Sequence, residues 1–234
     1  SVKGGFYTNW TVLLATDNNK TNAPLRAQAA QYQHTGTINE IAVYTPTQLK
    51  DSSGNNYHAN TAGLNNSAGK VGYAKDFNSL SDFAFIGSYT QLDNASNMSA
   101  EAWVFPTLQT AATHYRVFSK QHVLYVGQYG DQVSCYLGTS AAWGVTEVTG
   151  GTLTLNQWNH IACVKSGTSY YVYVNGQLTK SGTGAPATLG TNSNNAYLGT
   201  YDGTTQSWSG SIDEVRISNT ARSADEIRQA YEVG

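Results

Sequence analysis

Flat aromatic rings and hydrogen-bonding side chains gather in three segments of the second half of the chain, at residues 138–143, 191–195 and 201–208. Aromatic rings can stack on sugar faces, and carboxylate and amide groups bind sugar hydroxyls in concave sites. The candidate glycan-binding residues are Trp143, Tyr201, Asp202 and Trp208. The alternative is that Tyr and Asn only cover a weakly charged surface and that Trp208 belongs to the core.

The acidic residues are not spaced for hydrolysis of sugars. A retaining glycosidase needs two carboxyl groups roughly 5 Å apart, which acids alternating along one strand supply most simply. Glu101 is followed by four residues without an acid, and the adjacent Asp213 and Glu214 would point to opposite faces of a strand. The sequence contains no Gly-x-Ser-x-Gly, His-Glu-x-x-His or phosphate-loop motif. We therefore expect a protein that is not an enzyme.

Two cysteines, Cys135 and Cys163, are the only ones in the chain. This number excludes a small disulfide-framework protein and a zinc site made of cysteines. Both lie in strand-like segments, at residues 132–137 and 158–165. A disulfide across the sheet and a pair of buried free thiols are both compatible with this pattern.

Charge and hydropathy exclude two classes of partner. Charged residues make up 12% of the 234 residues and the net charge is −2, whereas roughly a quarter is charged in an ordinary soluble domain. No basic run is present to bind a nucleic acid backbone. The longest apolar runs, residues 12–15 and 161–164, are far shorter than the roughly 20 residues of a transmembrane helix. We expect no nucleic acid partner and no transmembrane segment.

Two features favour an extracellular location. The sequence begins with Ser1 and its only methionine is Met98, as in a chain whose export signal has been removed. Triplets of the N-glycosylation type occur at Asn9, Asn19, Asn65, Asn94 and Asn97. A chain rich in Asn and Thr also produces such triplets by chance, so glycosylation and chance are both open.

Short segments rich in Val, Tyr, Phe and Ile, separated by turn residues, predict an antiparallel all-β fold. The predicted strands of the second half span residues 115–119, 122–128, 132–137, 159–165, 170–175, 177–180, 196–200 and 208–218. Asn175-Gly176 predicts a tight hairpin with a type I′ turn. Ser223, with Glu226 three residues later, predicts the capping box of a short C-terminal helix.

The first half is less regular. Strands are predicted at residues 40–45, 82–86 and 100–105, and residues 51–58 are predicted to form a folded loop. Residues 1–38 differ in character, because one strand-like segment, residues 10–15, is followed by a polar tract. We therefore divide the chain into an N-terminal extension, residues 1–38, and a main domain, residues 39–234.

Six segments of the main domain resemble, in this order, the landmarks of laminin G-like domains of the concanavalin A-like jelly-roll superfamily. They are residues 49–58 (LKDSSGNNYH), 76–83 (DFNSLSDF), 100–106 (AEAWVFP), 157–164 (QWNHIACV), 171–177 (YVYVNGQ) and 210–217 (GSIDEVRI). The resemblance implies a jelly-roll sandwich of two antiparallel sheets and an extracellular location. The large apolar residues of these segments are expected to pack between the sheets; they are Trp103, Trp158, Val164, Tyr173, Val215 and Ile217.

The resemblance also implies a structural calcium ion. In this superfamily the acid that leads the last strand often binds calcium together with main-chain carbonyls, and Asp213 matches that position. Asn78 is the second candidate ligand, because loops with Asp, Asn and carbonyl oxygens suit a hard cation. The alternative is that Asp213 pairs with Arg216 or caps a turn.

From these features we expect a secreted, non-enzymatic laminin G-like domain that recognises a glycan or surface glycoprotein in adhesion. The second hypothesis is a self-assembling subunit of an extracellular filament, surface layer or viral exterior. In that case Trp10, Val12 and Leu14, on one face of a strand, would join the sheet edge of a neighbouring copy. The same segment could also dock on its own domain.

Overall fold

The computed structural model describes residues 28–29, 32–33, 48–140 and 146–234. Most of these residues form two large antiparallel sheets, in which the side chains of each strand alternate between the two faces. By its internal contacts the chain divides into residues 1–45 and residues 46–234. In the first unit the structure describes only the pair formed by β1 (Gln28–Ala29) and β2 (Tyr32–Gln33). The assembly residues Trp10, Val12 and Leu14 and the expected strand at residues 40–45 lie outside the described residues.

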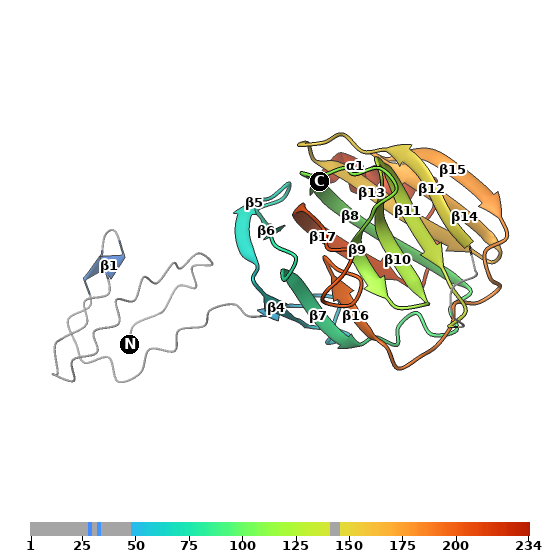
Figure 1. The fold of residues 1–234 in the computed structure, drawn as a ribbon, viewed down its shortest axis with the longest axis horizontal. Coiled ribbons are helices and arrows are strands. Elements are labelled where there is room, and N and C mark those ends of the chain that lie inside the picture. The colour runs from blue at the N-terminus through green and yellow to red at the C-terminus, as the bar shows by residue number, and fades with distance from the viewer. Residues whose placement is uncertain (1–27, 30–31, 34–47, 141–145) are drawn as a thin grey trace. The chain divides into compact units, whose positions relative to one another are not determined.

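The first sheet of the second unit has eight strands, of which β7, β16, β9, β10 and β11 lie side by side in Figure 1. In spatial order they are β12 (Thr146–Thr152), β11 (Gln132–Leu137), β10 (Leu124–Tyr129), β9 (His114–Lys120), β16 (Asn195–Leu198), β7 (Phe83–Ser88), β4 (Ala59–Ala62) and β3 (Gln48–Leu49). All neighbours in this sheet are antiparallel.

The second sheet has seven strands, and all of its neighbours are also antiparallel. Their spatial order is β15 (Gln177–Thr183), β14 (Ser169–Val174), β13 (Asn159–Ser166), β8 (Asn97–Pro106), β17 (Gly210–Ser218), β6 (Tyr73–Phe77) and β5 (Asn65–Ala68). The prediction of a jelly-roll sandwich with two antiparallel sheets is confirmed.

Apolar side chains from the inner faces of both sheets form one core. Leu124 and Val126 of the eight-stranded sheet belong to the same buried cluster as Met98 and Ile161 of the seven-stranded sheet. Cys135 on β11 and Cys163 on β13 form a disulfide, which therefore joins the two sheets inside this core. Of the two alternatives for the cysteines, the disulfide is the one that the structure supports.

Two local predictions are confirmed at the level of single residues. Asn175 and Gly176, between β14 and β15, have φ angles of 50° and 73°, as a type I′ turn requires. Helix α1 (Ala224–Val233) begins with the predicted capping box. The Ser223 hydroxyl accepts a bond from the Glu226 amide, and the Glu226 carboxylate accepts one from the Ser223 amide.

Helix α1 covers the outer face of the seven-stranded sheet. Its Ile227 packs with Val164 of β13 and Tyr173 of β14, and the ring of Tyr231 lies 5.5 Å from that of Trp103 on β8. The expectation that Trp103, Val164 and Tyr173 pack between the sheets is therefore wrong. These residues are buried because a strand sends alternate side chains to opposite faces, and the helix covers the face that is not in the core.

Several strands were not predicted. In the second unit they are β3, β4, β5, β6 and β12. Strand β3 has only two residues, β4 and β5 are rich in Ala, Asn and Ser, β6 contains Lys75 and Asp76, and β12 contains two glycines. Such residues have little intrinsic preference for strands, so these segments are strands because their neighbours in the sheet supply hydrogen-bonding partners.

We predict that replacing both cysteines by serine lowers the free energy of unfolding by about 3–4 kcal/mol, the chain-entropy value for a loop of 28 residues. Chemical denaturation of the oxidised protein and of the double variant measures this difference. Reduced wild-type protein should unfold at nearly the same denaturant concentration as the variant. Equal stability of the oxidised and reduced proteins would contradict a disulfide that joins the sheets.

Candidate functional site

One row of side chains crosses the eight-stranded sheet on the face turned away from the core. Its members, which are direct cross-strand partners, are Asn60, Phe85, Tyr197, Ser119, Tyr125 and Tyr136. Their chain neighbours Ala84 and Ala196 are fully buried. Because side chains alternate along a strand, the pairing register alone places six hydrogen-bonding or aromatic side chains on one surface.

The loop between β16 and β17, residues 199–209, lies over this row. Two residues in the middle of the row, Ser119 and Tyr125, contact the loop. The Ser119 hydroxyl is 2.7 Å from the carbonyl oxygen of Thr200 and 2.8 Å from that of Tyr201. The ring of Tyr201 lies 5.2 Å from that of Tyr125, and Gln121 donates a 2.7 Å bond to the Tyr201 hydroxyl. Tyr201 is 8% exposed. The role expected for Tyr201, as a ring open to a sugar, is corrected to that of an anchor for the loop.

A buried arginine fastens the other end of the same loop. The Arg116 guanidinium lies 4.6 Å from the centre of the Tyr125 ring, and its Nε donates a 2.7 Å bond to the Gln206 side chain. Burial lowers the pKa of Arg116, and the negative charge of Glu147 acts in the opposite direction. A cation held over an aromatic face and bonded to the loop fixes residues 201–206 against the sheet.

Asp202 is exposed at the tip of the loop and organises a turn. Its Oδ1 accepts bonds from the backbone amides and the hydroxyls of Thr204 and Thr205, at 2.9–3.0 Å. Burial raises the pKa of the Asp202 carboxyl, but these hydrogen bonds outweigh burial and leave the pKa below its usual value. The side chain is therefore a fixed anion at neutral pH.

Beside Asp202 the surface has a shallow aromatic hollow of about 480 Å³. Its aromatic wall consists of three half-buried rings, Phe83 and Phe85 of β7 and Tyr197 of β16. The ring centres of Phe83 and Phe85 lie 6.0 and 5.4 Å from that of Tyr197, in edge-on contact. The polar lining is Asn60, Thr61, Asp202 and Thr204. The hollow thus combines apolar ring surface with hydroxyl, amide and carboxylate groups.

Trp208, another residue predicted to bind a glycan, does not line this hollow. Trp208 is 2% exposed and belongs to the core, so its ring is closed to a sugar and its expected role is corrected to core packing. Trp143 lies outside the described residues. Of the three described residues that were expected to bind a glycan, Asp202 is the one in the lining of the hollow.

The predicted calcium ligands are not brought together. Pairing of β17 with β6 sets Gly210 opposite Phe77 and Ile212 opposite Lys75. Asn78 and Asp213 are therefore four strand positions apart, roughly 13 Å at 3.3 Å per residue. Asp213 accepts 2.9 Å bonds from the amides of Val71 and Glu214. It caps a turn, and the pair does not fit one calcium ion; the described residues also contain no group of three or more His, Cys, Asp or Glu residues placed for a metal.

The predicted glycosylation sites differ in their surroundings. Asn65 on β5 and Asn94 are exposed. Asn97 is half-buried, and its side-chain oxygen accepts a bond from the Gly167 amide. Asn9 and Asn19 lie outside the described residues. Among the described sites, Asn65 and Asn94 therefore remain the accessible candidates.

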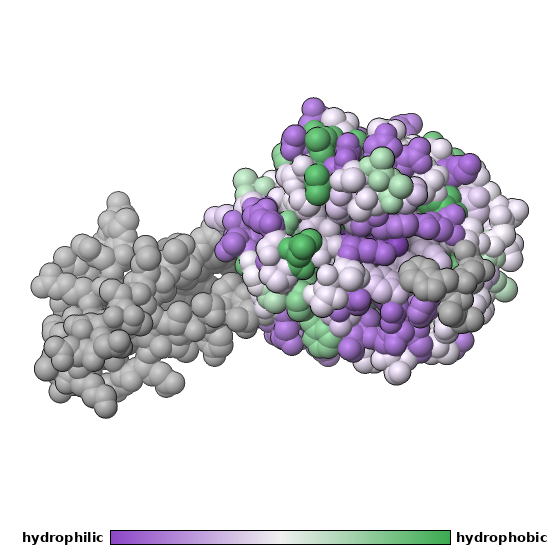
Figure 2. Space-filling view, in the orientation of Figure 1, coloured by the Kyte–Doolittle hydropathy of each residue, from purple (hydrophilic) through white to green (hydrophobic). Residues whose placement is uncertain are grey.

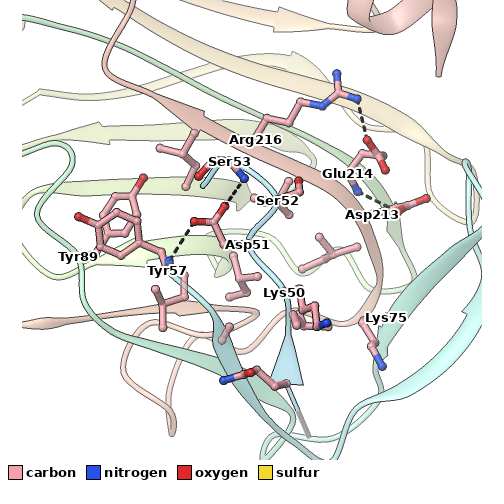
Figure 3. A pocket seen from close by; sticks show the side chains of 18 of the residues that line it. Lys50, Asp51, Ser52, Ser53, Tyr57, Lys75, Tyr89, Asp213, Glu214 and Arg216 are labelled. Atoms are coloured by element: carbon pink, nitrogen blue, oxygen red, sulfur yellow. Dashed lines mark hydrogen bonds and ion pairs between the residues drawn. The ribbon is translucent and has the colours of Figure 1, made fainter. Parts of the chain in front are cut away.

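A second, larger hollow of about 790 Å³ lies between the two sheets, where β3, β4 and β7 face β6 and β17. Figure 3 shows this hollow, which we call the slot, with Asp51 and Tyr57 along one side and Asp213, Glu214 and Arg216 along the other. Asp51 accepts bonds from the amides of Ser53 and Tyr57. Hydrogen bonding by Ser53 is the main cause that lowers the pKa of Asp51, and partial burial opposes it.

The aromatic hollow was missed by sequence reasoning although a signal for it exists. Phe83 and Phe85 are two residues apart in a segment that was predicted as a strand, so they had to share a face. Nothing in the segment says whether that face is the core face. Tyr197 joins them only because β16 pairs with β7, a contact between residues more than a hundred positions apart.

A family model described as the concanavalin A-like lectin/glucanases superfamily, of the laminin G type, matches residues 78–228. This match covers more than half of the chain. The chain belongs to this superfamily. A search of curated proteins finds no match.

Solved structures with the same fold include sugar-binding and toxin domains. Domain 4 of AbnA, an extracellular arabinanase from Geobacillus stearothermophilus solved with arabinotriose, has a TM-score of 0.57 and 22% identity, over 72% of this chain and 81% of that domain. The binding domain of botulinum neurotoxin serotype G has a TM-score of 0.62 and 18% identity, over 79% of this chain and 48% of that one. The binding domain of paraclostridial mosquitocidal protein 1 has a TM-score of 0.63 and 14% identity, over 82% of this chain and 50% of that one.

At these identities the likeness establishes the fold of this concanavalin A-like domain. The chain spans about half the length of the two toxin binding domains and four fifths of the arabinanase domain. The laminin G-like assignment made from the six sequence segments is confirmed.

For Asp213→Ala we predict a loss of about 1–2 kcal/mol in the free energy of unfolding, because two backbone amides lose a charged acceptor. Thermal denaturation of this concanavalin A-like domain and of the variant, each with calcium and with a chelator, measures the loss. The difference should be the same in both media. If calcium stabilised the wild type and not the variant, Asp213 would be a metal ligand after all.

Proposed function

We propose that this domain binds an oligosaccharide in the aromatic hollow beside Asp202. The observation that carries the proposal is the half-buried wall of Phe83, Phe85 and Tyr197 next to a fixed carboxylate. A sugar ring has apolar C–H faces and a rim of hydroxyls, so it needs flat apolar surface and hydrogen-bonding groups together. The hollow offers both within one open surface.

The chemistry of the two hollows favours the aromatic one for a sugar. The slot is lined on its inside by aliphatic side chains, among them Ile86, Leu198, Val215 and Ile217. Charged side chains also line the slot, but Asp51 and Asp213 accept bonds from backbone amides and Glu214 is paired with Arg216. A sugar in the slot would have to compete with these bonds, and its hydroxyls would lose hydration against the aliphatic walls. The hollow beside Asp202 stays open to water, and hydroxyls not bound by the protein remain solvated.

The solved relatives support a binding role. The arabinanase domain was solved with arabinotriose, and a botulinum neurotoxin DC binding domain of 9% identity and TM-score 0.57 was solved with SialylT. We transfer from them the class of ligand, an oligosaccharide or the glycan of a glycoprotein. The individual sugar is left to experiment.

The role that we propose is binding without catalysis. Glu101 and Asp213 lie on the same face of neighbouring strands, because their partners across the β8–β17 pair are Arg216 and Trp103. Glu101 is 3% exposed and lies 3.6 Å from both His160 and Arg222, so a substrate does not reach it. Asp213 is occupied by backbone amides. This carboxylate pair therefore lacks the access that general acid catalysis needs.

We also propose that the protein works outside the cell. The disulfide between the sheets persists in oxidising compartments, and Asn65 and Asn94 are accessible to a glycosylating enzyme. The described residues contain no helix that is long and apolar enough to cross a membrane. On the face seen in Figure 2, hydrophilic and weakly polar side chains predominate and hydrophobic ones form small separate patches. Such a surface suits a domain that meets a hydrated glycan.

We predict that Phe85→Ala and Tyr197→Ala each weaken binding by about 1–3 kcal/mol, which corresponds to a roughly 5- to 150-fold rise in Kd. Each substitution removes one stacking surface, while both residues lie on the face away from the core. A glycan array identifies the oligosaccharide, and titration calorimetry with that sugar gives Kd for each variant.

The matched control is Tyr73→Ala, which removes an aromatic ring that is 73% exposed on β6, outside the aromatic hollow. It should bind like the wild type. Circular dichroism and melting temperature establish that all variants are folded. The proposal fails if folded Phe85→Ala and Tyr197→Ala bind the sugar with unchanged Kd.

A further inference from the structure

The loop that carries Asp202 meets the aromatic wall at a glycine. Gly203 has a φ angle of 92°, in the region that favours glycine. A Cβ at this position would lie 3.6 Å from Cε1 of Tyr197 and 3.8 Å from Cζ of Phe83. The backbone next to Asp202 therefore runs beside these two rings, and the glycine keeps a side chain off their surface.

The tip of the loop uses its hydrogen-bond donors within the loop. The Gly203 amide donates a 3.2 Å bond to the hydroxyl oxygen of Thr200. The amides and the hydroxyls of Thr204 and Thr205 all donate to Oδ1 of Asp202. Every amide and hydroxyl hydrogen of residues 203–205 is thus already bonded. Toward the hollow, these three residues can offer a ligand hydrogen-bond acceptors only.

The two carboxylate oxygens of Asp202 have different surroundings. All four bonds that this side chain accepts from the described residues end on Oδ1. Oδ2 therefore keeps its lone pairs for a ligand. The side chain is exposed and belongs to the lining of the aromatic hollow. One oxygen of the carboxylate holds the loop together, and the other is available at the surface.

The aromatic hollow is negatively charged. Asp202 is the one charged residue of its lining among the described residues, which include no Lys, Arg or His there. Burial raises the pKa of this carboxyl less than the hydrogen bonds lower it, so the group is an anion at neutral pH. Arg116, at the other end of the loop, is 1% exposed and out of reach of a ligand. Such a site attracts a cation and repels a second carboxylate.

We propose that the ligand of the aromatic hollow is an oligosaccharide of amino sugars, and that Oδ2 of Asp202 binds an ammonium group of this ligand. The inference rests on the function proposed above and names the class of sugar. An ammonium has three donors and no acceptor, so it complements a loop tip that offers acceptors only. The neighbouring rings of Phe83 and Tyr197 add attraction for a cation.

Neutral and acidic sugars fit the same surface less well. A hydroxyl of a neutral sugar can donate to Oδ2 of Asp202, but its bond lacks the contribution of a second charge. An acidic sugar would bring its carboxylate toward Asp202 without a cation in the described lining to balance it. The hollow therefore ranks amino sugars before neutral ones and acidic sugars last.

The first test compares two sugars that differ in one group per residue. The β-1,4-linked tetramers of glucosamine and of glucose have the same backbone, with an ammonium or a hydroxyl group at C2. In titration calorimetry at neutral pH and low salt, the wild type should bind the glucosamine tetramer about 5-fold more tightly, as one charged pair at a surface allows. High salt should reduce this preference, because it screens exposed charges.

The second test is Asp202→Asn. This variant keeps Oδ1 as the acceptor for the loop and exchanges Oδ2 for an amide nitrogen, so the charge is removed while the turn is preserved. The preference for the glucosamine tetramer should disappear. The matched control is Asp131→Asn, in the turn between β10 and β11, which removes an equal charge from an exposed position outside the lining. It should keep the wild-type preference.

The outcomes separate this inference from the function on which it rests. Loss of the preference in Asp202→Asn and its retention in Asp131→Asn supports the inference. Equal affinity of the wild type for both tetramers, or the same change in both variants, overturns the inference alone if Phe85→Ala still weakens binding. Binding of another sugar but of neither tetramer also overturns the inference alone. A wild type that binds no sugar on a glycan array overturns the proposed function and this inference together.

Discussion

The two-residue period of the β-strand is the constraint on which this structure depends. Each strand of the eight-stranded sheet sends one set of side chains into a shared core and the alternate set to the outer face. Burial of the inner set stabilises the sandwich, and the disulfide between Cys135 and Cys163 joins its two layers from within. The outer side chains are not needed for the core and can form a binding surface. On β7 and β16 they include the three rings of the aromatic hollow.

The same constraint explains which parts of the fold could be predicted from the sequence. Strands such as residues 132–137, the type I′ turn at Asn175-Gly176 and the capping box at Ser223 have local signals, and the structure contains each of them. Strands β4 and β5 have no such signal, because Asn, Ala, Thr and Ser become strands there through pairing with neighbours. Local patterns predicted the architecture, whereas the sheet edges depend on contacts between distant residues.

The site was harder to predict than the fold for a related reason. Aromatic residues in loops were taken as sugar platforms, but Tyr201 and Trp208 are buried, because a loop that crosses a sheet needs apolar anchors of its own. Conversely, Phe83 and Phe85 lie in a strand and are partly open, because β4 and β16 on either side of β7 leave their outer face uncovered. Asp202, at the tip of the anchored loop, lies in the lining of the hollow, and its role in binding a glycan stays a prediction. Burial could not be read from residue type in any of these cases.

The central claim is that the aromatic hollow is the glycan-binding surface of this concanavalin A-like domain, and NMR titration tests it most directly. The isotopically labelled full chain is titrated with an oligosaccharide selected on a glycan array, and amide and aromatic shifts are followed. The account predicts saturable shifts at Phe83, Phe85 and Tyr197 and in residues 202–204, with the slot residues Val215 and Ile217 unaffected. Shifts confined to the slot or to the outer face of the seven-stranded sheet, with none at the hollow, would contradict it.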